Sequence, residues 1–334
     1  MDAKQWLDEL RDSEVKRAMP ILSFPSISLL GVTVRELISD SSLQARGMKM
    51  IADRVNSAAS VSMMDLSVEA ECFGSQIRFS DAEVPTVTGA IIENEEQAVA
   101  MEIPSVGIGR TGKYIEAIGK ACELINDRPV LAGVIGPFSL AGRLMDVSEA
   151  MVRCYTDPEM VHITMRKVSA FLTEYIKAYK NVGANGVVIA EPLTGMLSPD
   201  LAAEFSSPYV KQIIAEVQSD DFVVVYHNCG DNTILMIDSI LSVGASAYHF
   251  GNAINMSDMM AHIPGDTVAF GNVSPAAQFR GGTPESIKAE TKRILTECRE
   301  YKNFVISSGC DIPPSSPWEN IDAFFEAVDE FYKG

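Results

Sequence analysis

The chain has 334 residues, of which 47% are hydrophobic and 22% charged, so it can bury a sizeable core. Its 27 Lys and Arg against 45 Asp and Glu give a formal net charge of -18, which repels polyphosphate and anionic lipid and excludes nucleic acid and membrane surfaces as expected partners. Six Cys are too few for a disulfide scaffold, the charged N-terminus is unlike a signal peptide, and no apolar run reaches the ~18 residues of a spanning helix, so we expect a cytoplasmic protein.

The N-terminal third predicts two amphipathic helices, over Lys4–Met19 and Leu43–Ala58, followed by a strand from Val61 to Asp65. Residues 72–91 read as a loop or hairpin, because polar and turn residues interrupt the short apolar runs there. We expect residues 1–60 to form a helical extension in front of the main fold.

From about residue 128 onward, short β-branched runs alternate with longer amphipathic segments, which indicates βα units and a parallel sheet. The predicted strands are Pro129–Ile135, Gly186–Ala190, Phe222–Tyr226, Ala245–Phe250, Thr267–Phe270 and Phe304–Ser307. The predicted helices are Asp157–Asn181, Pro199–Gln218, Thr233–Val243, Ser257–Ile263, Thr283–Tyr301 and Pro317–Tyr332. No linker or GxGxxG motif is present, so the pattern favours one α/β domain over residues 1–334, with a (βα)8 TIM barrel over 61–334.

In parallel α/β folds the chemistry lies at the carboxyl ends of the strands, and the polar residues there form a short, reactive set. They are Asp65, Glu191, His227, Cys229, His249, Asn272 and Cys310. Two of the four His, two of the six Cys and two carboxylates are thus expected at one rim.

His227 and Cys229 are two residues apart in an extended segment, so their side chains point to the same side. Cys310, at a later strand end, can supply a second thiolate, and one nitrogen with two sulfurs leaves Zn²⁺ an open position for catalysis. The alternative is that both Cys are buried small hydrophobes and His227 a hydrogen-bonded core residue. The strand-end location and the neighbouring Gly230 and Gly309 favour the metal site.

The remaining rim residues are candidates with open alternatives. Glu191 can act as acid or base, orient a ligand, complete the metal site, or simply cap the next segment. His249 either lines the pocket or packs structurally, and the acidic cluster of Asp65, Glu69 and Glu71 either binds substrate or forms a solvated face. We take Glu191, His249 and Asp65 as candidate catalytic groups, and Asn272, Glu71 and Met196 as candidate substrate contacts.

Three segments together resemble a known family. Tyr226-His227-Asn228-Cys229-Gly230, Phe270-Gly271-Asn272-Val273-Ser274-Pro275 and Ser308-Gly309-Cys310-Asp311-Ile312-Pro313-Pro314 look like the uroporphyrinogen decarboxylase superfamily, and more narrowly its zinc-dependent methylcobamide:coenzyme M methyltransferases. The resemblance runs from about residue 60 to the C-terminus. It implies a (βα)8 barrel with His227, Cys229 and Cys310 as zinc ligands. The segment Met19–Gly31 lacks the arginines with which the true decarboxylases grip tetrapyrrole carboxylates, which argues against decarboxylation.

The resemblance implies a methyltransferase with Zn²⁺ that moves a methyl group between a corrinoid such as methylcobalamin, brought by a small carrier protein, and a thiol such as coenzyme M. Alternatives are transfer from a methylated amine, alcohol or methoxyl compound to Co(I), or from the corrinoid to tetrahydrofolate. A metal-free decarboxylase and a non-catalytic zinc protein are less favoured readings. The fourth zinc ligand, the direction of transfer and the oligomeric state, a homodimer being one option, stay open.

Overall fold

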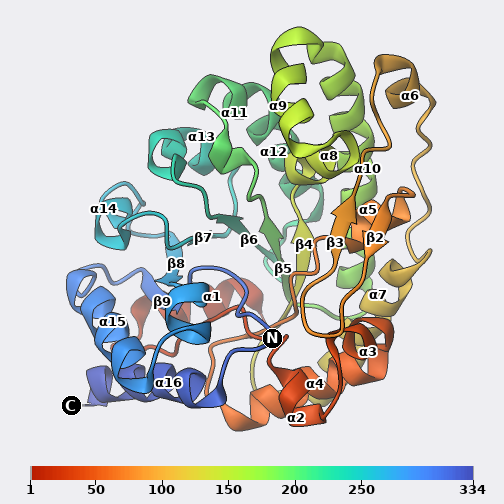
Figure 1. Cartoon of the computed structure of the whole chain (residues 1–334). Coiled ribbons are helices and arrows are strands. Elements are labelled where there is room, and N and C mark those ends of the chain that lie inside the picture. The colour runs from red at the N-terminus through yellow and green to blue at the C-terminus, as the bar shows by residue number, and fades with distance from the viewer. Residues whose placement is uncertain (1, 334) are drawn as a thin grey trace.

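The computed structural model describes residues 2–333, and its centre is a curled sheet of seven parallel strands with helices outside it (Figure 1). The strand order is β1-β4-β5-β6-β7-β8-β9, so successive βα units add neighbouring strands. The sheet strands are β1 (Ser60–Val61), β4 (Val130–Ile135), β5 (Gly186–Ala190), β6 (Val223–Asn228), β7 (Ala247–Phe250), β8 (Val268–Val273) and β9 (Phe304–Ser308). An antiparallel hairpin, β2 (Gln76–Arg78) with β3 (Thr86–Thr88), lies outside this sheet.

The helices begin at residues suited to helix starts. Ser198 and Thr283 accept hydrogen bonds from the first turns of α11 (Pro199–Phe205) and α15 (Pro284–Glu297), and each is followed by a proline at the first helical position. The helices before β5 are α1 (Ala3–Asp12), α2 (Ser26–Leu30), α3 (Val34–Ser39), α4 (Ser41–Arg54), α5 (Val68–Cys72), α6 (Glu95–Ala100), α7 (Arg110–Leu124), α8 (Pro137–Met145), α9 (Val147–Thr156) and α10 (Pro158–Asn181). Those after it are η1 (Thr194–Met196), α11 (Pro199–Phe205), α12 (Ser207–Val217), η2 (Thr233–Met236), α13 (Ile237–Leu241), α14 (Met256–Met260), η3 (Pro275–Arg280), α15 (Pro284–Glu297) and α16 (Trp318–Lys333).

The sheet strands are buried on both faces, which is why they read as continuous apolar runs. One apolar cluster fills the space between sheet and helices. A second lies on the concave side and takes alternate residues of the strands, such as Val223 and Val225 of β6. The interior of the curled sheet is therefore a packed core.

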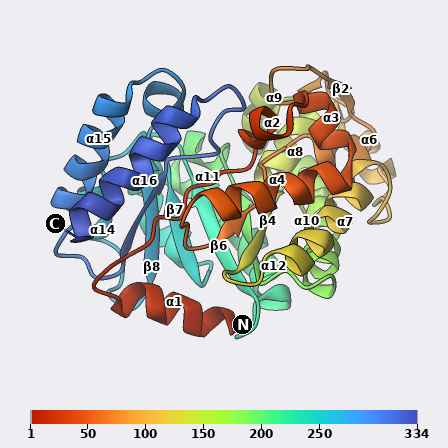
Figure 2. The ribbon, with the colours of Figure 1, turned by 90° about the horizontal axis from the view of Figure 1, so that it is seen from below.

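Helix α1 closes the end of this interior at which the strands begin. Trp6 stacks on Phe270 of β8 with ring centroids 6.5 Å apart, and its indole N–H donates to the Ala58 carbonyl at 3.1 Å. The backbone N–H of Lys4 donates to Asp220, just ahead of β6, at 3.0 Å. Figure 2 shows α1 at its lower edge, beneath β7 and β8. The opposite end, where the strands finish, is left for chemistry.

The segment between α1 and α2 lies between the two edges of the sheet. The N–H of Met19 donates to Ile306 of β9 at 3.0 Å, and the N–H of Ala58, just before β1, donates to Ala18 at 2.7 Å. The segment thus takes the eighth position around the barrel. The α/β barrel predicted from the sequence is confirmed, with the N-terminal segment contributing to its wall.

Some predicted elements have different bounds. The helix predicted over 4–19 ends at Asp12, where the next residue, Ser13, has extended backbone geometry and Lys16 donates to the free carbonyls of Leu10 and Arg11. The helix predicted over 199–218 is two helices, since Ser206 ends α11.

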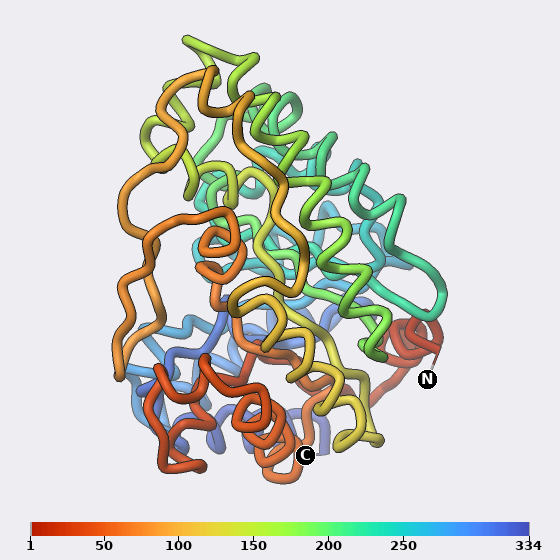
Figure 3. Tube along the Cα trace, turned by 90° about the vertical axis from the view of Figure 1, so that its right-hand side faces the viewer, coloured from red at the N-terminus to blue at the C-terminus, as the bar shows by residue number. Residues whose placement is uncertain are grey.

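Several helices of the first 160 residues were not predicted at all, among them α7, which packs against α4 on the side of the molecule seen in Figure 3. Within residues 2–333 no helix is both long enough and apolar enough to cross a membrane.

Candidate metal centre at the mouth of the barrel

Strands β6 and β7 place two imidazoles side by side at the carboxyl ends of the barrel strands. Val223 and Val225 face the interior, and the two-residue period of a strand brings His227 to the same side. The register of β6 with β7 pairs His227 with His249. Their Nδ1 atoms lie 2.7 Å apart, and the two side chains are buried.

Cys229 and Cys310 join His227 at this end. Cys229 directly follows β6 and Cys310 follows β9, and the candidate ligand atoms of the three residues all lie within 4.8 Å of one another. Glycine makes room for this convergence, because a Cβ on Gly251 would lie 2.4 Å from the Cβ of Cys229. The structure therefore brings together the three residues that the sequence suggested as metal ligands.

The hydrogen-bonding state of His227 fits a metal ion. Its Nδ1 contacts His249, whereas its Nε2 is buried with no hydrogen-bond partner among the described residues. A buried, unpaired polar atom is unfavourable unless a further group satisfies it. One imidazole nitrogen and two thiol sulfurs form a soft donor set of the kind that selects zinc, with bonds of ~2.0–2.3 Å and a fourth position left open.

The two thiols influence each other. The Cys310 thiol lies against Cys229 and lowers the pKa of Cys229, while the same contact together with burial raises the pKa of Cys310 to about 12. One sulfur is thus the more readily ionised of the pair, and a bound cation would favour the thiolate form of both.

Glu191 lies at the end of β5 with its carboxylate turned toward helix α8. Its two oxygens accept hydrogen bonds from the backbone N–H groups of Phe138 at 3.0 Å and Ser139 at 2.6 Å, at the helix start. Burial raises the pKa of Glu191 to about 7, although these hydrogen bonds act in the opposite direction. Glu191 therefore caps the start of a helix that precedes it in the chain, whereas the capping alternative considered for this residue concerned the segment that follows it.

Asp65 and Glu71 are joined by an arginine that the sequence did not single out. Arg110, the first residue of α7, forms ion pairs with both carboxylates, the one to Glu71 at 2.5 Å. Asp65 also accepts hydrogen bonds from the hydroxyls of Tyr114 at 2.7 Å and Ser67 at 2.6 Å. The side chain of Asp65 is fully buried, so this is an internal ion-pair network and not a solvated acidic face.

Three further charged groups near this network carry unpartnered atoms: Glu69 Oε2, Arg143 Nε and Asp311 Oδ1 have no hydrogen-bond partner within the described part of the chain. Burial raises the pKa of Glu69 to about 7 and that of Asp311 well above its usual range. Asp311 also accepts a hydrogen bond from the Met64 N–H at 2.7 Å. Glu69 belongs to the acidic cluster that the sequence indicated, and Asp311 is next to Cys310 in the sequence, whereas no pattern indicated Arg143.

The two remaining candidates have different environments. The Asn272 amide donates to the carbonyls of Gly251 and Ile254, both at 2.9 Å, and so holds the loop that follows β7. Met196, on η1 after β5, is 57% exposed. Asn272 thus has its amide N–H groups engaged, whereas Met196 is available for contact at the rim.

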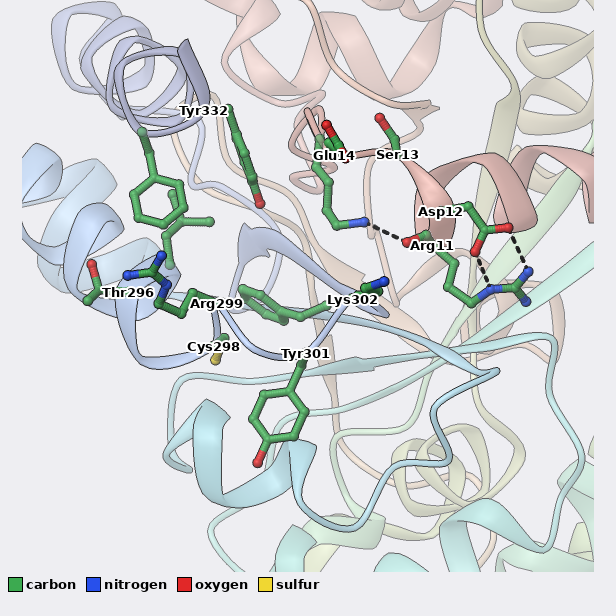
Figure 4. Close-up of a pocket in the computed structure, with 14 residues that line it drawn as sticks. Arg11, Asp12, Ser13, Glu14, Thr296, Cys298, Arg299, Tyr301, Lys302 and Tyr332 are labelled. Atoms are coloured by element: carbon green, nitrogen blue, oxygen red, sulfur yellow. Dashed lines mark hydrogen bonds and ion pairs between the residues drawn. The ribbon is translucent and has the colours of Figure 1, made fainter. Parts of the chain in front are cut away.

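A separate cavity of about 580 Å³ lies at the other end of the barrel (Figure 4). It is lined by Phe304, the first residue of β9, whereas Cys310 follows the last residue of that strand. Arg11 in this cavity is paired with its neighbour Asp12, as the dashed lines in Figure 4 show. The cavity is therefore distinct from the metal centre.

Comparison with known proteins agrees with the parallel α/β barrel. Residues 17–331 match the family model described as Uroporphyrinogen decarboxylase (URO-D). The chain belongs to this family.

Two curated relatives carry different activities. The chain is 26% identical over 271 residues to a methylcobamide:CoM methyltransferase, MtbA, of Methanosarcina acetivorans, covering 80% of this chain and 78% of the relative. It is 27% identical over 285 residues to a uroporphyrinogen decarboxylase of Alcanivorax borkumensis, covering 81% and 78%.

Among solved structures, a methyltransferase from Methanosarcina mazei superimposes with a TM-score of 0.86 at 24% identity over 99% of both chains. A B12-independent methionine synthase from Shewanella sp. W3-18-1 superimposes with a TM-score of 0.61 at 12% identity over 96% of both chains. These likenesses support the barrel fold.

Proposed function

We propose that this chain is a zinc-dependent methyltransferase that moves a methyl group between a corrinoid, carried by a separate small protein, and a small-molecule thiol. The observation that carries the proposal is the convergence of His227, Cys229 and Cys310 within 4.8 Å, with a buried and unpartnered imidazole nitrogen among them. The similarity to the methylcobamide:CoM methyltransferase of Methanosarcina acetivorans supports it.

His227, Cys229 and Cys310 would hold the zinc ion, which when bound supplies the positive charge that keeps a substrate thiol in its reactive thiolate form. The barrel core beneath the cluster and helix α1 below it exclude water from one side of the site. In this reaction a carbon–sulfur bond forms, the cobalt–carbon bond breaks, and its electron pair stays on cobalt.

The rim residues have supporting roles in this proposal. Met196 offers exposed apolar contact to a corrinoid or to its carrier protein. The network of Asp65, Arg110 and Glu71 stiffens the wall between β1 and α7. Glu191 holds the start of α8, and Asn272 holds the loop after β7.

The test is metal content together with demethylation of methylcobalamin. We expect about one zinc per chain, and zinc-loaded protein that converts methylcobalamin to its demethylated form when supplied with a thiol such as coenzyme M, followed by the corrinoid absorption spectrum. His227→Ala and Cys310→Ala should lose zinc and activity together. Cys122→Ala, the same change in a half-buried cysteine of α7, should keep both.

The same preparation distinguishes the competing activities of the family. Assays with tetrahydrofolate or a methylated amine in place of the thiol identify the methyl acceptor and the direction of methyl transfer. Decarboxylation of uroporphyrinogen by the protein, unaffected by zinc removal, would contradict the proposal.

A further inference from the structure

A chain of hydrogen bonds connects the N-terminal segment to His227. The hydroxyl of Ser307 donates to the Met19 carbonyl at 2.7 Å. The oxygen of Ser307 lies 2.8 Å from Nε2 of His249, and Nδ1 of His249 lies 2.7 Å from Nδ1 of His227. All four residues are buried, so bulk water does not compete for these contacts.

The backbone carbonyl gives this chain a direction. A carbonyl oxygen can only accept, so the single hydroxyl proton of Ser307 is used on Met19. The Ser307 oxygen must then accept from an N–H at Nε2 of His249. A neutral imidazole carries one N–H, which leaves Nδ1 of His249 as an acceptor. His227 therefore donates from its Nδ1, and its Nε2 keeps a lone pair.

The reverse direction is unfavourable. If the Ser307 hydroxyl donated to His249 instead, the buried Met19 carbonyl would lose its donor. His249 would then donate to His227, and the proton of His227 would move to Nε2. That proton would occupy the nitrogen needed for a metal bond, beside the two thiols.

We propose that His249, held by Ser307 and the Met19 carbonyl, is the positioning residue that fixes His227 in the tautomer with a proton on Nδ1 and a lone pair on Nε2. The proposal rests on the metal site proposed above and extends it beyond the three ligands. In many metal sites the ring nitrogen of histidine that does not bind the metal donates its N–H to a carboxylate or carbonyl. Here the acceptor is another histidine, His249.

This arrangement links barrel closure to the site. Met19 belongs to the segment that lies between β9 and β1, and its N–H donates to Ile306 of β9 at 3.0 Å. Ser307 follows Ile306 in the same strand. The segment that completes the barrel wall therefore also supplies the acceptor that orients the hydrogen-bond chain.

The first experiment reads the tautomer in the metal-free protein by ¹⁵N NMR of histidine-labelled chain. We expect an unprotonated Nε2 and a protonated Nδ1 for His227, and the reverse assignment for His249. His162 is not part of the cluster and contacts Tyr209, so it provides an internal reference. A proton on Nε2 of His227 in the parent protein would overturn the proposal.

The second experiment measures zinc affinity by competition with a chelator in three variants. His249→Leu removes the acceptor and should weaken zinc binding ~10–100-fold. His249→Asn places an amide oxygen close to the lost Nδ1 and should restore most of the affinity. Ser307→Ala is a smaller change that frees the tautomer of His249, and it should weaken zinc binding less than His249→Leu does. It provides the test if His249→Leu folds poorly. Parent-like affinity in the folded His249→Leu and Ser307→Ala variants would overturn the inference.

The two proposals fail in distinguishable ways. A parent protein that binds no zinc would refute the proposed function, while the metal-free NMR spectrum would still decide whether the chain from Met19 to His227 runs as described. A parent that binds zinc but shows His227 protonated on Nε2 when metal-free would refute only the role of His249.

Discussion

Gly195 and Gly230 lie with their backbones in contact, so that a Cβ built on Gly230 would be 2.3 Å from the Cα of Gly195 and one built on Gly195 would be 2.4 Å from the Cα of Gly230. Gly195 is part of η1 after β5, and Gly230 directly follows Cys229. The two loops that border the candidate metal centre on this side are therefore in backbone contact at a point where no side chain fits.

Gly230→Ala should disturb this contact and shift Cys229. We expect a loss of ~1–3 kcal/mol in the free energy of unfolding, because the neighbouring backbone has little freedom to move. Zinc affinity should fall as well. Denaturant titration and chelator competition measure the two effects. Gly265→Ala is the matched control, since a Cβ there meets nothing within 4 Å. Equal free energies of unfolding and equal zinc affinities for Gly230→Ala and Gly265→Ala would refute this account of the contact.

A second prediction concerns the buried ion pair of Asp65 with Arg110. Arg110→Met leaves the buried carboxylate of Asp65 without its cation, which should cost ~3–5 kcal/mol of stability. Adding Asp65→Asn should recover part of that loss, because the uncompensated charge is then gone.

The control for this pair is Arg299→Met. Its side chain is 69% exposed and lies 3.6 Å from Glu300, so its loss should change stability by no more than ~0.5 kcal/mol. Guanidinium unfolding of all three variants measures the comparison. A double variant as unstable as Arg110→Met alone would show that the loss comes from packing and not from the charge of Asp65.

The convergence of His227, Cys229 and Cys310 could be predicted from the sequence because these residues lie at strand ends and follow the strand period. Val223, Val225 and His227 alternate along β6, and the same alternation carries Cys229 to the interior side. Cys310 could be added since the ends of parallel strands share one edge of the sheet.

Groups outside the strands could not be predicted in the same way. Arg110 reaches Asp65 from the start of α7, 45 residues along the chain, and no local pattern encodes that contact. The sequence placed Met19 at the end of a helix, whereas it lies outside any helix and its carbonyl accepts a hydrogen bond from Ser307, 288 residues away. Such placements depend on how distant segments pack, which periodicity does not report.

A third prediction distinguishes capping from catalysis at Glu191. In Glu191→Gln one carboxylate oxygen becomes an amide donor that faces the backbone N–H of Phe138 or Ser139. We expect a loss of ~1–3 kcal/mol in stability, with methyl transfer by the folded, zinc-loaded protein largely kept. Thermal unfolding measures the change in stability, and single-turnover rates measure methyl transfer. The exposed Glu300→Gln is the control. Unchanged stability with lost methyl transfer would instead assign Glu191 a catalytic role.

The last prediction uses the buried carboxyl of Glu69. Burial raises its pKa from 4.5 to about 7, so between these values the folded protein holds a proton that the unfolded chain releases. Stability therefore falls as pH rises through this window. A shift of this size corresponds to ~3 kcal/mol in total, most of it lost between pH 5 and pH 8. Asp65, Cys72, Arg143, Tyr175 and Tyr179 are ionisable groups that interact electrostatically with Glu69.

Glu69→Gln removes this titration and leaves the surrounding groups in place. The stability of Glu69→Gln relative to the parent should therefore rise by ~2–3 kcal/mol from pH 5 to pH 8, because only the parent must ionise a buried carboxyl. Urea unfolding of both proteins at several pH values gives this difference directly. Glu123→Gln, at an exposed position near the end of α7, should follow the parent at every pH. A Glu69→Gln curve parallel to that of the parent would mean that Glu69 keeps its charge on folding, compensated by the positive charge of Arg143.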